Sequence, residues 1–238
     1  RRLLSELSKW FDDDYIAEHF TPEYNPWDQR MCLIPNADLY KAIKRGDAEV
    51  RTELIDSFVE KGVRLQSGEV LTADIIVTAT GLKLSVLSGV EFYVDNQHIN
   101  VPDTFSYKGM MLSSVPNMLQ TFGYINASWT LRADLNSEYL CRLLNHMDQI
   151  GMSKVTPILR EEDEGMEARP WIENFPSGYM MRSMHLFPRQ GEGPWRNTQD
   201  FNADKKMVRE GPIEDSALRF SKPVTNQVSV PLKDTEAA

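Results

Sequence analysis

The chain has 238 residues, a formal net charge of −9 and a pI near 5.0, with 41% apolar and 10% aromatic residues. This length and composition allow one or two domains with a sizeable core, and no stretch approaches the roughly 20 apolar residues that span a bilayer. The acidic balance argues against a nucleic-acid partner, because neutralising phosphates needs clustered Lys and Arg.

Two cysteines, Cys32 and Cys141, are too few for a disulfide framework or a zinc site. We expect both to be core residues of a cytoplasmic protein, where thiols stay reduced. The sequence opens without a signal-peptide pattern. Because it begins with Arg1 and not Met, we expect that the gene product starts upstream.

Short helices and strands are predicted for the first 72 residues. Apolar spacing predicts a helix over residues 1–15, and a second helix that Asn36 caps and Gly46 ends. Ser67 and Gly68 suit the tight turn of a hairpin over residues 62–71. Further short strands are expected over residues 30–34, 49–52 and 55–60.

The strongest strand prediction covers Ala73-Asp-Ile-Ile-Val-Thr-Ala-Thr-Gly81, which is apolar on both faces like a buried strand of an α/β sheet. Residues 91–108 are expected to be irregular around a turn at Asp95-Asn96. A second buried strand is predicted over residues 117–123. The clearest helix follows, from Ser128 to about Gly151, with Asn126 or Ser128 as its cap.

From residue 152 onward the helical and strand periodicity weakens, and Pro and Gly recur. We expect a wrapping tail with large apolar anchors instead of an independent core. These anchors are Trp171, Phe175, Tyr179, Met180, Met181 and Trp195. The pairs Met110-Met111 and Met180-Met181 suit either an adaptable pocket or core filling.

The familiar catalytic fingerprints are absent from the sequence. No G-x-G-x-x-G, G-x-S-x-G, H-E-x-x-H or C-x-x-C occurs. The four histidines lie far apart and lack metal-ligand spacing, so we expect solvent-exposed or capping roles for them. They are His19, His98, His146 and His185. By itself the chain therefore shows no self-sufficient catalytic apparatus.

Two segments are candidates for ligand contact. A buried strand ending at Gly81 brings backbone close to the carboxyl edge of a sheet, where α/β folds bind ligands, although a plain strand entering a turn explains it equally. Residues 122–129 combine a strand end, a Gly and a helix start. Unpaired N–H groups at a helix N-terminus suit an anion or a carbonyl that gains negative charge, but an ordinary capped helix fits this spacing better.

The chain resembles the class B flavoprotein monooxygenases in four segments that follow one another in the family's order. They are Phe20-Thr-Pro-Glu-Tyr-Asn-Pro-Trp-Asp-Gln-Arg-Met-Cys-Leu33, Ala73-Asp-Ile-Ile-Val-Thr-Ala-Thr-Gly-Leu82, Tyr107-Lys-Gly-Met-Met-Leu-Ser-Ser-Val-Pro-Asn-Met118 and Gly123-Tyr-Ile-Asn-Ala-Ser-Trp-Thr-Leu-Arg-Ala-Asp-Leu135. Within that class the nearest branch is the Baeyer–Villiger type, including monooxygenases that activate the prodrug ethionamide. The resemblance covers nearly all of residues 19–221.

This resemblance implies an α/β fold made of the C-terminal parts of two Rossmann-like domains, followed by a largely irregular wrap. Residues 1–72 resemble the last part of the NADPH-binding domain, and residues 73–151 resemble that of the FAD-binding domain. Residues 152–221 resemble the C-terminal wrap near the substrate pocket, and residues 222–238 are expected to be a disordered tail. Both glycine fingerprints of the family are expected upstream of residue 1.

The implied activity is that of an FAD- and NADPH-dependent monooxygenase. Such enzymes insert one oxygen atom of O₂ into ketones, or oxygenate sulfur and nitrogen centres, through a C4a-peroxyflavin. The expected partners are therefore a small organic substrate and O₂, while homo-oligomerisation stays open. Two other interpretations also stay open: a non-catalytic α/β module, and a subunit that completes its site with a partner chain.

The resemblance also assigns roles to individual residues. It implies that Arg30 lies over the flavin, where its guanidinium stabilises the peroxyflavin anion and holds the nicotinamide. Thr80 and Gly81 would approach cofactor phosphate or ribose. The turn of Gly123, Asn126, Ala127 and Ser128 would present N–H groups to the C2 oxygen of the flavin. Tyr124 and Trp129 would line the ring and the substrate pocket, with core packing as the alternative for each.

Overall fold

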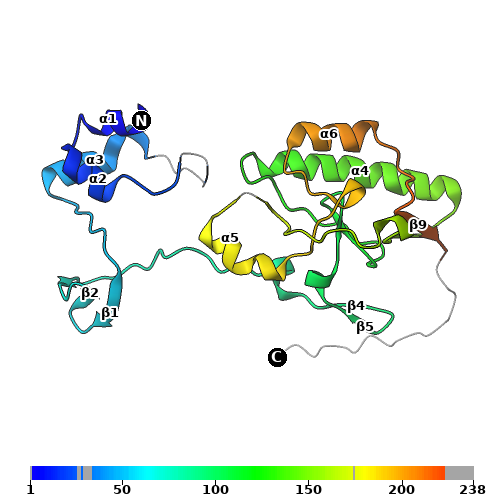
Figure 1. The fold of residues 1–238 in the computed structure, drawn as a ribbon, viewed down its shortest axis with the longest axis horizontal. Coiled ribbons are helices and arrows are strands. Elements are labelled where there is room, and N and C mark those ends of the chain that lie inside the picture. Colours follow the sequence, from blue (N-terminus) through cyan, green and yellow to red (C-terminus); the bar gives the residue numbers. More distant parts are fainter. Residues whose placement is uncertain (1, 26–27, 29–33, 174, 223–238) are drawn as a thin grey trace, which may run out of the picture. The chain divides into compact units, whose positions relative to one another are not determined.

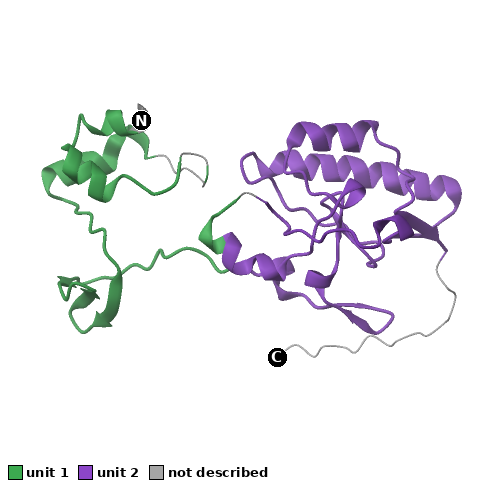
Figure 2. Ribbon diagram, viewed as in Figure 1, with its two compact units in different colours: residues 1–83, 175–179 green, residues 84–174, 180–238 purple. Residues whose placement is uncertain are grey.

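The computed structural model describes residues 2–25, 28, 34–173 and 175–222. Two compact units contain them: residues 1–83 with 175–179, and residues 84–174 with 180–238 (Figure 2). The sheets among the described residues are small and antiparallel, so the chain mixes helices and sheets as expected for an α/β protein. The domain boundaries at 72/73 and 151/152 stay predictions.

Three short helices form the helical part of the first unit: α1 (Arg2–Leu7), α2 (Asp13–His19) and α3 (Asp38–Arg45), the last preceded by a 3₁₀ turn at Pro35–Ala37. The predicted helix over residues 1–15 is thus two helices. Asp12 caps the second by accepting from the N–H of Tyr15 at 2.9 Å. A small apolar core of Leu7, Phe11 and Ile16 lies between the helices, with the ring of Tyr40 edge-on to Phe11.

The helix predicted between residues 36 and 46 is confirmed, including its end at Gly46. Its predicted cap is wrong. Asn36 has a φ of 57° inside the preceding turn, and Ala37, which makes no side-chain cap bond, is the N-cap. The predicted strand over residues 30–34 and Cys32 lie outside the described residues, apart from Ile34.

A three-stranded antiparallel sheet completes the first unit. Its strands are β1 (Ile55–Val59), β2 (Gly62–Leu65) and β3 (Val70–Thr72), with β2 in the middle. The predicted hairpin is confirmed, and Gly68 takes the positive φ of 92° that its turn requires. No strand forms over residues 49–52.

The strand predicted over residues 73–81 is wrong for this structure. The segment after β3 is extended but belongs to no sheet, and its side chains face solvent, with Ile75 82% and Val77 83% exposed. A strand that is apolar on both faces needs neighbouring strands and covering layers, and the described residues supply neither. Local sequence predicted the extended backbone, but burial depends on elements far away in sequence.

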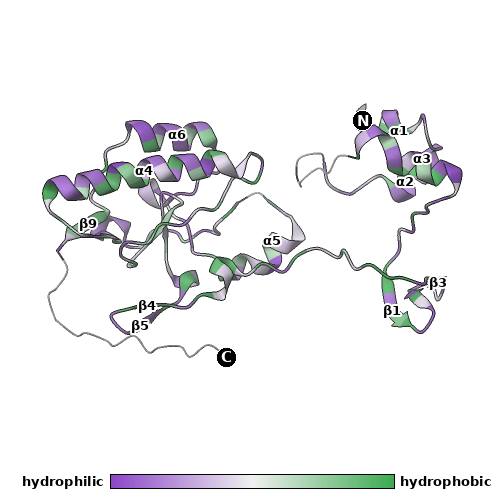
Figure 3. Ribbon diagram, turned by 180° about the vertical axis from the view of Figure 1, so that it is seen from behind, coloured by the Kyte–Doolittle hydropathy of each residue, from purple (hydrophilic) through white to green (hydrophobic). Residues whose placement is uncertain are grey.

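The second unit is built on one long helix, α4 (Trp129–Ile150), along which polar and apolar residues alternate (Figures 1 and 3). This helix and both of its ends are confirmed. Ser128 is the N-cap, and Gly151 ends the helix with a left-handed φ of 66°. This helix packs against α6 (Phe201–Glu210).

Three two-stranded antiparallel sheets accompany these helices. They are β4 (Phe92–Val94) with β5 (Gln97–Ile99), β6 (Ser106–Tyr107) with β7 (Met111–Leu112), and β8 (Lys154–Pro157) with β9 (Leu218–Ser221). The first replaces much of the irregular structure expected over residues 91–108, although the turn at Asp95-Asn96 is confirmed. No strand forms over residues 117–123. The other short elements of this unit among the described residues are 3₁₀ turns at Val86–Gly89, Val101–Asp103, Glu161–Asp163, Met184–Leu186 and Gly193–Trp195. The short helix α5 (Gly178–Ser183) has its first two residues in the first unit.

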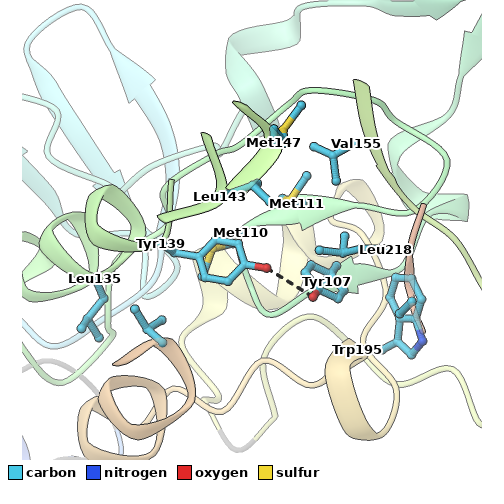
Figure 4. Close-up of a cluster of buried hydrophobic side chains, with 12 residues drawn as sticks. Tyr107, Met110, Met111, Leu135, Tyr139, Leu143, Met147, Val155, Trp195 and Leu218 are labelled. Carbon is cyan, nitrogen blue, oxygen red and sulfur yellow. Dashed lines mark hydrogen bonds between the residues drawn. The ribbon is translucent and has the colours of Figure 1, made fainter. Parts of the chain in front are cut away.

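The core of the second unit joins α4 to the segment after residue 152. Leu135, Tyr139 and Leu143 from the helix meet Met110 and Met111, which are core residues here (Figure 4). The later segment contributes Val155, Trp195, Val208 and Leu218. Of the predicted anchors, Trp195 lies in this core, and Trp171, Phe175 and Met180 are also buried. The prediction is wrong for Met181, which is 58% exposed. The prediction that Cys141 is a core residue is wrong, because Cys141 is exposed on α4.

Candidate functional site

The turn of residues 123–128 leads directly into α4. Ser128 caps the helix, and its hydroxyl oxygen lies 2.7 Å from that of Thr130. Gly123 is buried, and the ring of Trp129 lies directly over it, in contact with Phe122 at 5.1 Å between centroids. Trp129 is 49% exposed, so one part of its ring is available to a ligand.

Two of the backbone N–H groups in this turn have no acceptor among the described residues. The N–H of Ile125 donates to Oε1 of Gln199 at 3.0 Å. Within the described part of the chain, the N–H groups of Asn126 and Ala127 have no hydrogen-bond acceptor. Such neighbouring donors at the positive end of a long helix fit a carbonyl edge that gains negative charge, such as the pyrimidine edge of a flavin.

Tyr124 lies in the turn but does not face solvent. Its hydroxyl donates to Oδ2 of Asp204 at 2.8 Å, and burial raises its pKa to about 12, so it stays a donor at neutral pH. The guanidinium of Arg132 lies 5.9 Å from the centre of the Tyr124 ring. Tyr124 therefore belongs to a buried polar network beneath the turn.

Arg132 and Asp204 are the centre of that network and were missed by sequence reasoning. Nη1 of Arg132 donates to Oδ2 of Asp204, and Nη2 donates to the carbonyl oxygen of Lys108. Arg132 could have been noticed, because a charged residue three positions before Leu135 lies on the buried face of α4. Its partner could not, because 72 residues separate the two.

A second titratable cluster holds Tyr107 and Lys108 in the core. The hydroxyl of Tyr107 donates to Oδ2 of Asp215 at 2.6 Å, and Nζ of Lys108 lies 3.1 Å from the same oxygen. Burial raises the pKa of Tyr107 and also that of Tyr139, the latter to about 12. These contacts are structural, and they fix the Lys108 carbonyl that Arg132 binds.

An open hollow of about 520 Å³ lies in the second unit near the C-terminal segment. Its walls include Trp171, Phe187, His185 and Arg169. Neither Tyr124 nor Trp129 lines it. Phe122 contacts both Phe187, at 5.6 Å, and Trp129, so an aromatic chain connects the hollow to the turn.

The other expected site residues lie in the first unit or outside the described residues. Thr80 and Gly81 are exposed residues of the first unit, and Gly81 has a φ of 94°. Arg30 lies outside the described residues. Among the residues that the structure describes, no cluster of His, Cys, Asp or Glu suits a metal ion, and no helix is both long and apolar enough to cross a bilayer.

Comparison with known proteins shows close relatives along almost the whole chain, while no family model matches it. The chain is 47% identical over 224 residues to the FAD-containing monooxygenase EthA of Mycobacterium tuberculosis, an alignment that covers 93% of this chain. It is 46% identical over 217 residues to EthA of Mycolicibacterium smegmatis, covering 91% of the chain. It is 43% identical over 227 residues to AlmA of an Acinetobacter species, covering 93%.

The alignments cover only 45%, 43% and 44% of these three relatives, so the chain spans slightly less than half their length. Identity above 40% across more than nine tenths of a chain means common ancestry and a common fold for the aligned part. The resemblance that the four sequence segments indicated is thereby confirmed. The chain belongs to the EthA-like family of FAD-containing monooxygenases and corresponds to a part of such a protein.

Proposed function

We propose that this chain is the flavin-facing C-terminal part of an FAD- and NADPH-dependent monooxygenase. The enzyme would insert one oxygen atom of O₂ into ketones in a Baeyer–Villiger reaction, or oxygenate sulfur or nitrogen centres. The observation that carries the proposal is the 47% identity to an FAD-containing monooxygenase over 93% of the chain. The N–H groups of Asn126 and Ala127, which have no acceptor in the part of the chain that the structure describes, add a donor set that suits a flavin.

In this proposal each part of the chain has a limited task. FAD supplies the oxygen-activating chemistry when it is bound. The turn up to Ser128 offers N–H groups to the C2 oxygen, and Trp129 covers the ring with its exposed part. Thr80 and Gly81 approach phosphate or ribose through their backbone. Gly81 suits this role because it has no Cβ and takes a positive φ, so a ligand can come close to the chain there.

Arg30 has the electrostatic role in the proposal. A guanidinium stays charged at every working pH and stabilises an oxyanion that develops beside it. Removing one such donor from a dry site costs about 3 kcal/mol of barrier, or about 100-fold in rate. Tyr124 is assigned to holding the turn, because its hydroxyl already binds Asp204.

The test uses the complete protein, meaning the full product of the gene that encodes this chain. NADPH oxidation and product formation are measured with a panel of ketones and sulfides, for wild type, Arg30→Lys and Arg30→Ala. We expect both variants to keep FAD, with product formation lowered about 100-fold in Arg30→Ala. Unchanged oxygenation in Arg30→Ala would remove Arg30 from the site.

The same experiment separates the two other interpretations. If the purified gene product has no glycine fingerprint and gains FAD only with a second chain, the chain is a subunit that shares its site. If FAD binds under neither condition, the chain is a module without flavin chemistry. Both results would contradict a single-chain monooxygenase.

A further inference from the structure

The turn of residues 123–128 is held from beneath by the segment that begins α6. The hydroxyl of Tyr124 donates to Asp204, and the N–H of Ile125 donates to the side chain of Gln199. Thr198 donates to the other carboxylate oxygen of Asp204 at 2.7 Å. Two consecutive residues of the turn are therefore bound to one short stretch of chain, 80 residues later for Tyr124 and 74 for Ile125.

The carboxylate of Asp204 also binds Arg132, the residue on α4 one turn after its cap. Arg132 is 2% and Asp204 1% exposed, so both charges are out of water. Arg132 reaches Lys108 through a space that Gly109 leaves open, because a Cβ there would lie 2.5 Å from Nη2. The pair thus joins three segments: the Lys108 loop, the start of α4 and α6.

Stability alone is a weak reason for such a pair. Removing two charges from water costs several kcal/mol, and apolar residues of similar volume often stabilise a core as well or better. A buried pair does select one arrangement, because every alternative leaves a charge unpaired. Here the selected arrangement is that of the turn in which the N–H groups of Asn126 and Ala127 have no acceptor among the described residues.

We infer that Asp204, together with Arg132 and Tyr124, is a positioning residue that aims the turn of residues 123–128 at the flavin and thereby tunes its reduction. This inference rests on the proposed function. Reduction places negative charge at the C2 oxygen, so donors in the right orientation bind the reduced form more tightly than the oxidised form. A turn that is released from Asp204 loses part of this preference.

The expected effect has a defined size on the redox scale. A tenfold loss of preference for the reduced form lowers the midpoint potential of a two-electron couple by about 30 mV. A merely structural role would lower the FAD content or the melting temperature but leave the potential of the bound flavin unchanged. The potential therefore separates positioning from general stability.

The experiment compares Tyr124→Phe and Asp204→Asn with Glu138→Gln in the complete, FAD-loaded protein. Tyr124→Phe removes only the hydroxyl that binds Asp204. Glu138→Gln is the matched control, since Glu138 pairs with Arg209 at 2.6 Å between the same two helices, on the exposed surface. Midpoint potential, flavin absorption spectrum and melting temperature are recorded for each.

We expect Tyr124→Phe to lower the potential by about 30 mV and to shift the flavin absorption bands, with wild-type values for Glu138→Gln. If Asp204→Asn does not fold, Tyr124→Phe decides. A wild-type potential and spectrum in a folded Tyr124→Phe protein would overturn the inference while leaving the proposed function intact. If wild type itself binds no FAD, the proposed function fails, and the inference fails with it.

Discussion

The ring of Trp129 lies so close to Gly123 that a Cβ at residue 123 would be 2.1 Å from its Cγ. No other residue type fits at this position without moving the ring. Because Trp129 is also the first residue of α4, this contact sets where the turn ends and the helix starts.

We therefore predict that Gly123→Ala destabilises the second unit by about 1–3 kcal/mol, the usual cost of an overpacked site. In a Trp129→Ala background the same change should cost almost nothing, because the clashing ring is gone. Urea unfolding of the four proteins in this double-mutant cycle measures the coupling. Equal costs in both backgrounds would show that the contact is not the constraint.

The hydrogen bonds of Asp163 predict that the fold loses stability in acid. It accepts from Nε of Arg160 at 2.8 Å and from the ring N–H of Trp195 at 2.9 Å, and the Arg160 bond above all lowers its pKa. Because the pKa of this carboxyl is lower in the folded than in the unfolded chain, ionised Asp163 stabilises the fold fully above the unfolded pKa near 3.9. This stabilisation is lost progressively as the pH falls from there toward the lower pKa of the folded state.

We expect Asp163→Asn to lower the unfolding free energy by about 1.5–3 kcal/mol at pH 7, the range for hydrogen bonds to charged groups. The difference from wild type should stay constant down to about pH 5 and shrink below pH 4. Asp103→Asn is the control, because Asp103 pairs with Arg189 only at 3.4 Å on the exposed surface. A gap that persists unchanged at pH 3 would contradict the assignment.

Lys108 and Asp215 form a nearly buried pair beside two tyrosines. The Lys108 side chain is 6% exposed, and its Nζ lies 4.9 Å from the centre of the Tyr107 ring. Lys108→Met should cost about 2 kcal/mol, because it leaves Asp215 without its cation, and Asp215→Asn in the same protein should recover part of the loss. Additive costs in denaturant unfolding would mean that the two groups do not interact.

The exposed apolar segment of residues 73–81, after β3, gives a prediction that differs between the isolated chain and the complete protein. In the isolated 238-residue chain, Ile75→Lys with Val77→Lys should leave stability unchanged and raise solubility, because both side chains face solvent. In the complete protein the same pair should abolish FAD binding, because we expect this segment to become a buried strand there. Leu54→Lys, at another exposed position of the first unit, is the control. Normal FAD content in the double variant would exclude the segment from any buried sheet.

Sequence alone predicted those elements whose signals are local. One such element is α4, whose apolar stripe, Ser128 cap and Gly151 end each depend on residues close together in sequence. Another is the hairpin around Gly68, which joins neighbouring strands. The prediction for residues 73–81 failed for the opposite reason, since burying an apolar strand on both faces needs neighbouring strands that no local signal predicts.

The candidate site shows the same division. A helix N-terminus with open N–H groups was predictable from the residues between Gly123 and Ser128. The buried partner of Arg132 was not, because Asp204 lies 72 residues away in a mostly charged stretch, and only the packing of α6 on α4 brings the two together.

The most direct test of the central claim is the FAD content of the purified complete protein, measured from its flavin absorption against protein concentration. We predict about one FAD per chain, with NADPH-driven O₂ consumption, and weak or no FAD binding by residues 1–238 alone. A complete protein that binds no FAD, or an isolated chain that binds FAD at micromolar concentration with a yellow flavin spectrum, would contradict it.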